Sequence, residues 1–145
     1  MSFYAWHTYG YGVELTNVTC DSLDRIKLLL SVAPNFEKKV NEWLRQYEIE
    51  EPTVEDYIEF DVDFHLGLAY ILQQVVLEAE DIELTACDDF DGRIYLLYAQ
   101  SYPWDMSDKD KSLKERDIAC ILVRYLTFLT SEEIPIDYYS PENGG

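Results

Sequence analysis

Basic residues are scarce in this sequence, and its middle third has none. Lysine and arginine together occur 11 times against 29 aspartates and glutamates, which gives a formal net charge of −18. No lysine or arginine lies between Gln46 and Gly92. A surface of this sign repels phosphate, so the composition argues against direct binding of nucleic acid. The charge also exceeds the magnitude of roughly 2 to 8 that keeps a small domain soluble. The excess calls for a basic partner, bound cations or a salty environment.

Membrane and targeting signals are missing as well. No apolar run reaches the roughly 18 residues of a membrane span, and the first residues lack the basic start and apolar stretch of a signal peptide. We therefore expect a cytoplasmic protein. The three cysteines, Cys20, Cys87 and Cys120, form no C-x-x-C pair and predict neither a zinc site nor a redox motif. Each is expected to be a small buried side chain.

Catalytic and cofactor motifs are also absent. The sequence has no G-x-S-x-G, no glycine-rich phosphate loop and no H-E-x-x-H. His65 follows Asp61 by four residues, a spacing that fits a helix-face contact as well as an acid–base pair. The acidic run 88–91 is followed by Gly92, but Tyr98 stands where an EF-hand carries its last glutamate. We expect no enzyme activity, no metal and no cofactor.

The chain does have enough apolar residues for one core. It has 145 residues, of which 48% are hydrophobic, and twelve are tyrosines. This length suits a single domain. We expect residues 1–140 to form one acidic domain and the polar residues 141–145 to form a flexible tail.

The first half predicts one strand followed by helices. Aromatic and β-branched residues over 3–15, with Gly10 and Gly12, predict an opening strand with a bend or bulge. Ser22 is a suitable N-cap for a helix that ends before Pro34, and a second helix starts around the next residue. Further on, residues 63–78 are apolar nearly all round and predict the most buried helix.

Two short sequence signals mark further elements. Thr53 and Asp56 resemble a capping box for a short helix that ends near residue 60. The pair Asp91-Gly92 lies between two β-type runs, 82–86 and 93–99, and predicts a tight hairpin with two central residues.

The last part predicts a helix and a strand. Ser112 and Glu115 form a capping box in front of a helical pattern. Residues 134–139 predict a final strand, in which Tyr138 and Tyr139 point to opposite faces, so that one is available to a partner. The fold class is therefore α+β. We expect a small mixed or antiparallel sheet, made of the N-terminal strand, the central hairpin and the C-terminal strand, packed with four to five helices.

The acids of the central block form two clusters in the sequence, one from residue 48 to 63 and one from residue 78 to 91. Neighbouring carboxylates on a helix lie roughly 5–6 Å apart, which is near the spacing of phosphates along a nucleic-acid strand. This block is a solvated face without a partner, a binding face, or a metal site or acidic active site. The residues predicted to bind a partner are Glu48, Glu50, Glu51, Glu55, Asp56, Glu59, Asp61, Asp63, Glu80, Asp81, Asp88, Asp89 and Asp91.

These observations favour an acidic protein-interaction module or inhibitor. Its partner would be a basic, nucleic-acid-binding protein, whose surface the carboxylates would occupy as a nucleic-acid mimic. Small acidic inhibitors from phages and mobile elements, including anti-CRISPR-like ones, offer an analogy that rests on size and charge alone. The alternative is a non-catalytic structural or assembly protein that self-associates through apolar and tyrosine surface.

Overall fold

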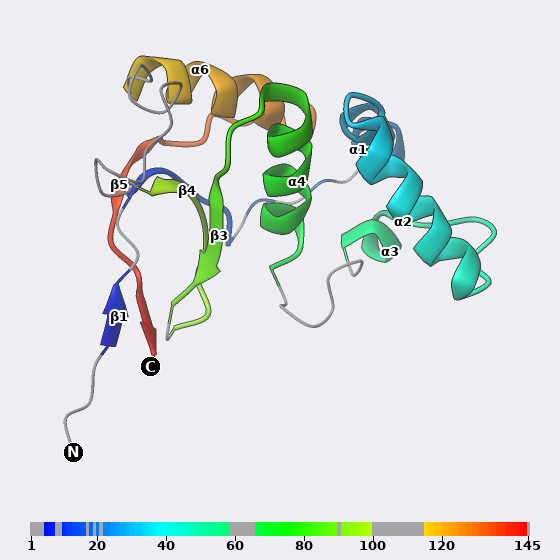
Figure 1. Cartoon of the computed structure of the whole chain (residues 1–145), viewed down its shortest axis with the longest axis horizontal. Helices are drawn as coiled ribbons and strands as arrows, with labels where there is room; N and C mark the ends of the chain where they lie inside the picture. Colours follow the sequence, from blue (N-terminus) through cyan, green and yellow to red (C-terminus); the bar gives the residue numbers. More distant parts are fainter. Residues whose placement is uncertain are drawn as a thin grey trace.

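The computed structural model describes residues 5–7, 10–16, 18, 20, 22–58, 66–89, 91–99 and 115–144. In this part of the chain the helices lie beside a curved antiparallel sheet, which confirms the predicted α+β class (Figure 1). The helices are α1 (Leu23–Ser31), α2 (Pro34–Gln46), α3 (Val54–Ile58), α4 (Leu68–Glu80) and α6 (Glu115–Leu126). The strands are β1 (Ala5–His7), β2 (Gly10–Glu14), β3 (Thr85–Asp88), β4 (Ile94–Ala99), β5 (Asp137–Tyr139) and β6 (Glu142–Gly144).

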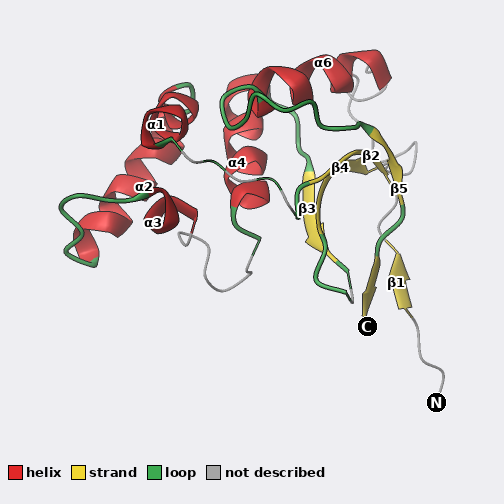
Figure 2. Cartoon of the chain, turned by 180° about the vertical axis from the view of Figure 1, so that it is seen from behind, coloured by secondary structure: helices red, strands yellow, loops and turns green. Residues whose placement is uncertain are grey.

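The main sheet has four strands in the order β3-β4-β2-β5, and each neighbouring pair is antiparallel. Figure 2 shows these strands curling into an arc. Helices α4 and α6 contact this sheet, and α1 and α2 pack further out. The core between helices and sheet contains fully buried side chains from each part, among them Val13, Leu96, Leu72 and Ile26.

The opening segment forms two strands instead of the single predicted one. Strand β1 pairs with β6 in a separate two-stranded sheet, whereas β2 joins the main sheet. Gly12 on β2 lies against β4, where a Cβ atom would come within 2.1 Å of the Leu96 carbonyl oxygen. The glycine is therefore required for a close approach of two backbones, as glycines in strands often are. Strand β6 also occupies most of the segment that the sequence predicts to be a flexible tail.

The first two helices begin and end close to the predicted positions. The Ser22 hydroxyl accepts a hydrogen bond from the Arg25 backbone N–H and caps α1. Helix α2 starts at Pro34, one residue before the predicted start, because proline suits the first helical position, where its missing N–H is no loss. Helix α4 is buried as predicted but begins at Leu68 after Gly67, which has φ of 55°. The predicted start at Asp63 lies outside the described residues.

The predicted hairpin is confirmed, but its loop is longer than the sequence suggests. Asp88 pairs with Ile94, and the Asp89 N–H donates to the Arg93 carbonyl at 3.0 Å. Three residues, 90–92, therefore lie between the paired positions, instead of the two expected. Gly92 has φ of 81°, which suits the last residue of a three-residue loop.

The C-terminal strand is shorter than predicted, because β5 covers only residues 137–139. Its two tyrosines do point to opposite faces. The ring of Tyr138 lies 5.1 Å from that of Tyr11, and the ring of Tyr139 lies 5.4 Å from that of Tyr95. The capping residue predicted for α6, Ser112, lies outside the described residues.

Candidate partner-binding surface

Among the described residues, the carboxylates predicted to bind a partner fall in three separate places. They lie on the α2–α3 connection with the first turn of α3, at the C-terminal end of α4 and on the β3–β4 hairpin (Figure 1). Helix α4 runs toward Glu80 and β3 runs back beside it, so the hairpin loop lies at the opposite end of this pair. The acids of the second sequence cluster, residues 78 to 91, therefore lie in two places in the structure. Glu59, Asp61 and Asp63 lie outside the described residues.

At the end of α2, a glutamate occupies a position that favours glycine. The Glu48 N–H donates to the Arg45 carbonyl and the Ile49 N–H to the Leu44 carbonyl, which is the Schellman arrangement at a helix C-terminus. Glu48 has φ of 58°, the left-handed region. The negative charge also lies at the negative end of the helix dipole. Glu48 therefore carries two local costs in stability.

Four acids around this position form what we call the acidic corner: Glu48, Glu50, Glu51 and Glu55. All four are exposed, and among the described residues none of them has a lysine or arginine in ion-pair distance. Tyr47 beside them is 63% exposed, and its ring lies 5.2 Å from that of Trp43. The corner thus combines uncompensated carboxylates with an exposed aromatic ring.

Asp56 lies next to the corner but has a structural role. Its carboxylate accepts a hydrogen bond from the Thr53 N–H at 2.8 Å, and the Asp56 N–H donates to the Thr53 hydroxyl at 3.4 Å. This is the predicted capping box at the start of α3. The side chain is committed to the helix terminus, so we place it outside the free carboxylates of the corner.

Two acids of α4 tie this helix to its neighbours. The Glu78 carboxylate accepts hydrogen bonds from the backbone N–H groups of Asn35 and Phe36, each at 2.9 Å. The Glu80 carboxylate accepts hydrogen bonds from Arg124 and from the Tyr125 hydroxyl, each at 2.7 Å. Glu80, a predicted partner-binding residue, is therefore part of the α4–α6 packing.

Asp81, the residue after α4, is exposed and has φ of 55°. Its N–H donates to the Leu77 carbonyl and closes the helix. Aspartate accepts this conformation more readily than most residues. As at Glu48, an acid stands at the end of a helix where the dipole disfavours it.

On the hairpin, Asp89 organises the loop. One carboxylate oxygen accepts from the N–H groups of Asp91 and Arg93 at 2.9 Å each, and the other accepts from the Tyr95 hydroxyl at 3.1 Å. Burial acts to raise the pKa of Asp89, but the hydrogen bonds outweigh it, the backbone N–H of Arg93 first, and lower that pKa. Asp88 and Asp91 are exposed on either side.

Tyr47 is the surface residue that the sequence did not single out. It follows the last residue of α2, Gln46, and its side chain is exposed. Tyr138 is 38% exposed, and its hydroxyl donates to the Glu115 carboxylate. An aromatic ring next to charged residues is typical of interface anchors.

The described residues form neither a metal site nor a membrane-spanning helix. They contain no group of three or more histidine, cysteine, aspartate or glutamate side chains placed to hold a metal ion. Among the helices described, none has the length and apolarity needed to cross a bilayer. Cys20 is buried and Cys87 half-buried, but Cys120 on α6 is exposed, so the prediction of three buried cysteines is wrong. His65 lies outside the described residues.

Comparisons with protein-family models, with curated proteins and with solved structures found no match to this chain. The function therefore has to be argued from the surface itself.

Proposed function

We propose that this protein is an acidic interaction protein, acting as an inhibitor, that binds the basic surface of a nucleic-acid-binding protein. The observation that carries the proposal is the acidic corner, in which four exposed carboxylates lie beside exposed Tyr47 without a described cation to compensate them. Charge complementarity of this kind steers association and selects the partner. Occupying the partner's basic surface would exclude nucleic acid from it.

The position of Glu48 supports a binding role over a mere solubility effect. Acids that served only solubility could lie at any exposed position, including positions where they do not lower the stability of the fold. Glu48 instead occupies a left-handed position at a helix C-terminus, where glycine would be more stable by up to about 1 kcal/mol. Retaining an acid there favours a function for the charge.

Tyr47 gives the corner a contact that does not depend on charge alone. A phenol ring offers its face to a lysine or arginine, and such cation–π contacts contribute about 0.5–1 kcal/mol at exposed sites. We infer that a basic side chain of the partner lies on this ring while its neighbours meet Glu50 and Glu51.

The test uses two charge-matched triple variants as bait in a pulldown from a bacterial lysate. In E50Q/E51Q/E55Q the corner loses three of its four charges, whereas D24N/E83Q/E132Q removes the same number of charges from exposed positions elsewhere. The wild type should capture a basic nucleic-acid-binding protein that elutes early in a salt gradient and competes with its nucleic acid. The corner variant should lose it, with affinity lowered at least about tenfold, and the control should keep it.

Two results would contradict the proposal. Equal capture by both variants would show that the corner is not the binding face. Recovery of the bait alone, running as an oligomer that salt does not dissociate, would favour the alternative of a self-associating structural protein.

A further inference from the structure

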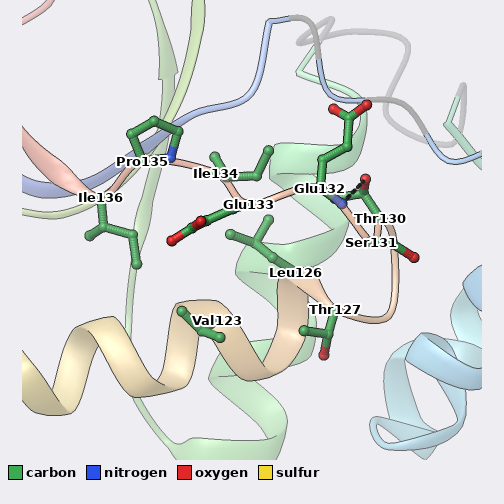
Figure 3. A pocket seen from close by; sticks show the side chains of 10 residues that line it. All are labelled: Val123, Leu126, Thr127, Thr130, Ser131, Glu132, Glu133, Ile134, Pro135 and Ile136. Atoms are coloured by element: carbon green, nitrogen blue, oxygen red, sulfur yellow. Dashed lines mark hydrogen bonds between the residues drawn. The ribbon is translucent and has the colours of Figure 1, made fainter.

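A groove separate from the acidic corner lies between α6 and the segment 130–136 that leads into β5 (Figure 3). Its volume is about 600 Å³, which is within the range of roughly 300–1,000 Å³ typical of ligand pockets. Apolar side chains make up most of its wall, namely Val123, Leu126, Ile134 and Ile136. Val123 is 51% exposed, so an apolar surface is left open to solvent here.

One carboxylate reaches into this apolar groove. Figure 3 shows the side chain of Glu133 extending across the opening toward Ile136, whereas the neighbouring Glu132 points away. Among the described residues, no ion pair or hydrogen bond engages the Glu133 carboxylate. A carboxylate above apolar walls fits a long side chain that has an aliphatic stem and a cationic head.

The surrounding charges agree with a cationic guest. The groove lies at the C-terminal end of α6, and the negative end of a helix dipole favours cations. Two arginines lie near the groove. Arg25 donates to the Thr127 carbonyl and the Ser131 hydroxyl, which belong to the groove wall at the end of α6, and Arg124 pairs with Glu80. Among the described residues neither arginine lies in ion-pair distance of Glu133, so this carboxylate is left for an incoming group.

We propose that this groove binds a lysine or arginine side chain of a protein partner. The methylene stem lies on Val123 and Ile136, and the charged head meets Glu133. The inference rests on the proposed function only for the basic nature of the partner. The groove residues are distinct from those of the acidic corner, so the two sites can be tested separately.

The experiment is a methyl NMR titration with two short peptides, Ac-Gly-Arg-Gly-NH2 and its neutral isostere in which citrulline replaces arginine. The arginine peptide should shift the methyl signals of Val123, Ile134 and Ile136 saturably, with Kd on the order of millimolar. Citrulline should bind about fivefold more weakly, because it keeps the shape and loses the charge.

Two adjacent variants give a matched control. Glu133→Gln should weaken binding of the arginine peptide until its Kd matches that of the citrulline peptide. Glu132→Gln makes the same change in net charge one residue away and should leave Kd within about twofold, because its side chain points out of the groove. Equal shifts by the two peptides, or equal loss in the two variants, would overturn the inference.

The outcomes also separate this site from the proposed function. If a basic protein is captured in the pulldown but the arginine peptide leaves the groove methyls unmoved, the groove inference fails and the acidic corner stands. If the peptide binds at Glu133 but no basic protein is captured, the groove site stands and the proposed function fails.

Discussion

Tyrosine hydroxyls donate hydrogen bonds to several carboxylates of the protein. Tyr125 donates to Glu80, Tyr95 to Asp89 and Tyr138 to Glu115. In a chain with so few lysines and arginines, a neutral phenol supplies a hydrogen-bond donor to the half-buried carboxylates of Glu80 and Asp89. The twelve tyrosines of the sequence therefore do more than fill the core.

The Tyr125–Glu80 contact predicts a loss of stability at alkaline pH. Burial and then the hydrogen bond to Glu80 raise the pKa of Tyr125 to about 12 from an ordinary value of 10.0. A raised pKa in the folded state means that the contribution is complete below pH 10 and is lost as the pH rises through 12. Between pH 9 and pH 11 this one group should lower the free energy of unfolding by about 1 kcal/mol.

Urea unfolding at the two pH values checks this prediction with two phenylalanine variants. Tyr125→Phe should lose about 1 kcal/mol less than the wild type over this interval. Tyr47→Phe changes an exposed tyrosine and should follow the wild type. An unchanged pH dependence in Tyr125→Phe would show that the contact with Glu80 does not control the titration.

For single side chains, contacts between residues close together in the sequence could be predicted, whereas contacts between residues far apart in the sequence could not. The capping box of Thr53 and Asp56 needs only a spacing of three residues, and the structure confirms it. Glu78 and Glu80 read as members of an acidic run, because their partners Asn35 and Tyr125 lie more than forty positions away. Nothing in the run itself distinguishes a structural acid from a free one.

Between elements, the contact that stands out is the cap that α4 provides for α2. Ala33 precedes α2 and has no side chain that could accept from the first N–H groups of the helix. The Glu78 carboxylate accepts from two of them instead, with its negative charge at the positive end of the helix dipole. One side chain therefore caps α2 and fixes its distance from α4.

We expect Glu78→Gln to destabilise the protein by about 1–2 kcal/mol, because it removes the charge and one of the two acceptor oxygens. Denaturant unfolding at neutral pH measures the change. Glu83→Gln removes the same charge from an exposed acid five residues away and should stay within about 0.5 kcal/mol of the wild type. Equal stabilities of the two variants would argue against the capping role of Glu78.

The order and type of most elements could be predicted, but the pairing of strands could not. Helical spacing and caps predicted α1, α2 and the buried α4, and the glycine turn predicted the hairpin. The split of the first segment into β1 and β2 depends on pairing with β6 and β4, which are far away in the sequence. The loop of three residues in the hairpin depends on the Asp89 side chain, which replaces a ladder hydrogen bond at Arg93.

For the molecule as a whole, the net charge of −18 predicts that salt increases stability. Carboxylates of the folded state repel one another, and raising the ionic strength from 0.01 M to 1 M shortens the Debye length from about 30 Å to about 3 Å. The free energy of unfolding should rise on the order of 1 kcal/mol, or about 3 °C in Tm. Sodium chloride and choline chloride should act alike, since screening does not depend on the cation. A constant or falling Tm would show that self-repulsion is unimportant.

The distribution of the acids over the surface was the part least accessible to the sequence. Composition predicted an acidic molecule, but in the part of the chain that the structure describes the two acidic runs occupy three separate places. One of them, the acidic corner, holds four carboxylates beside an aromatic ring. The groove at Glu133 left no sequence signal, because its apolar walls come from a helix and from the extended segment after it.

The contact between Trp43 and Tyr47 provides an optical reporter within the proposed binding surface. The two rings lie 5.2 Å apart at the end of α2, beside the acidic corner. Indole emission responds to the polarity of its surroundings, so a partner that covers this surface changes the fluorescence of Trp43. The sequence has only three tryptophans, and replacing Trp6 and Trp104 by phenylalanine leaves Trp43 as the one indole, which can be excited at wavelengths where the tyrosines do not absorb. Binding at the corner can then be followed in real time without a label.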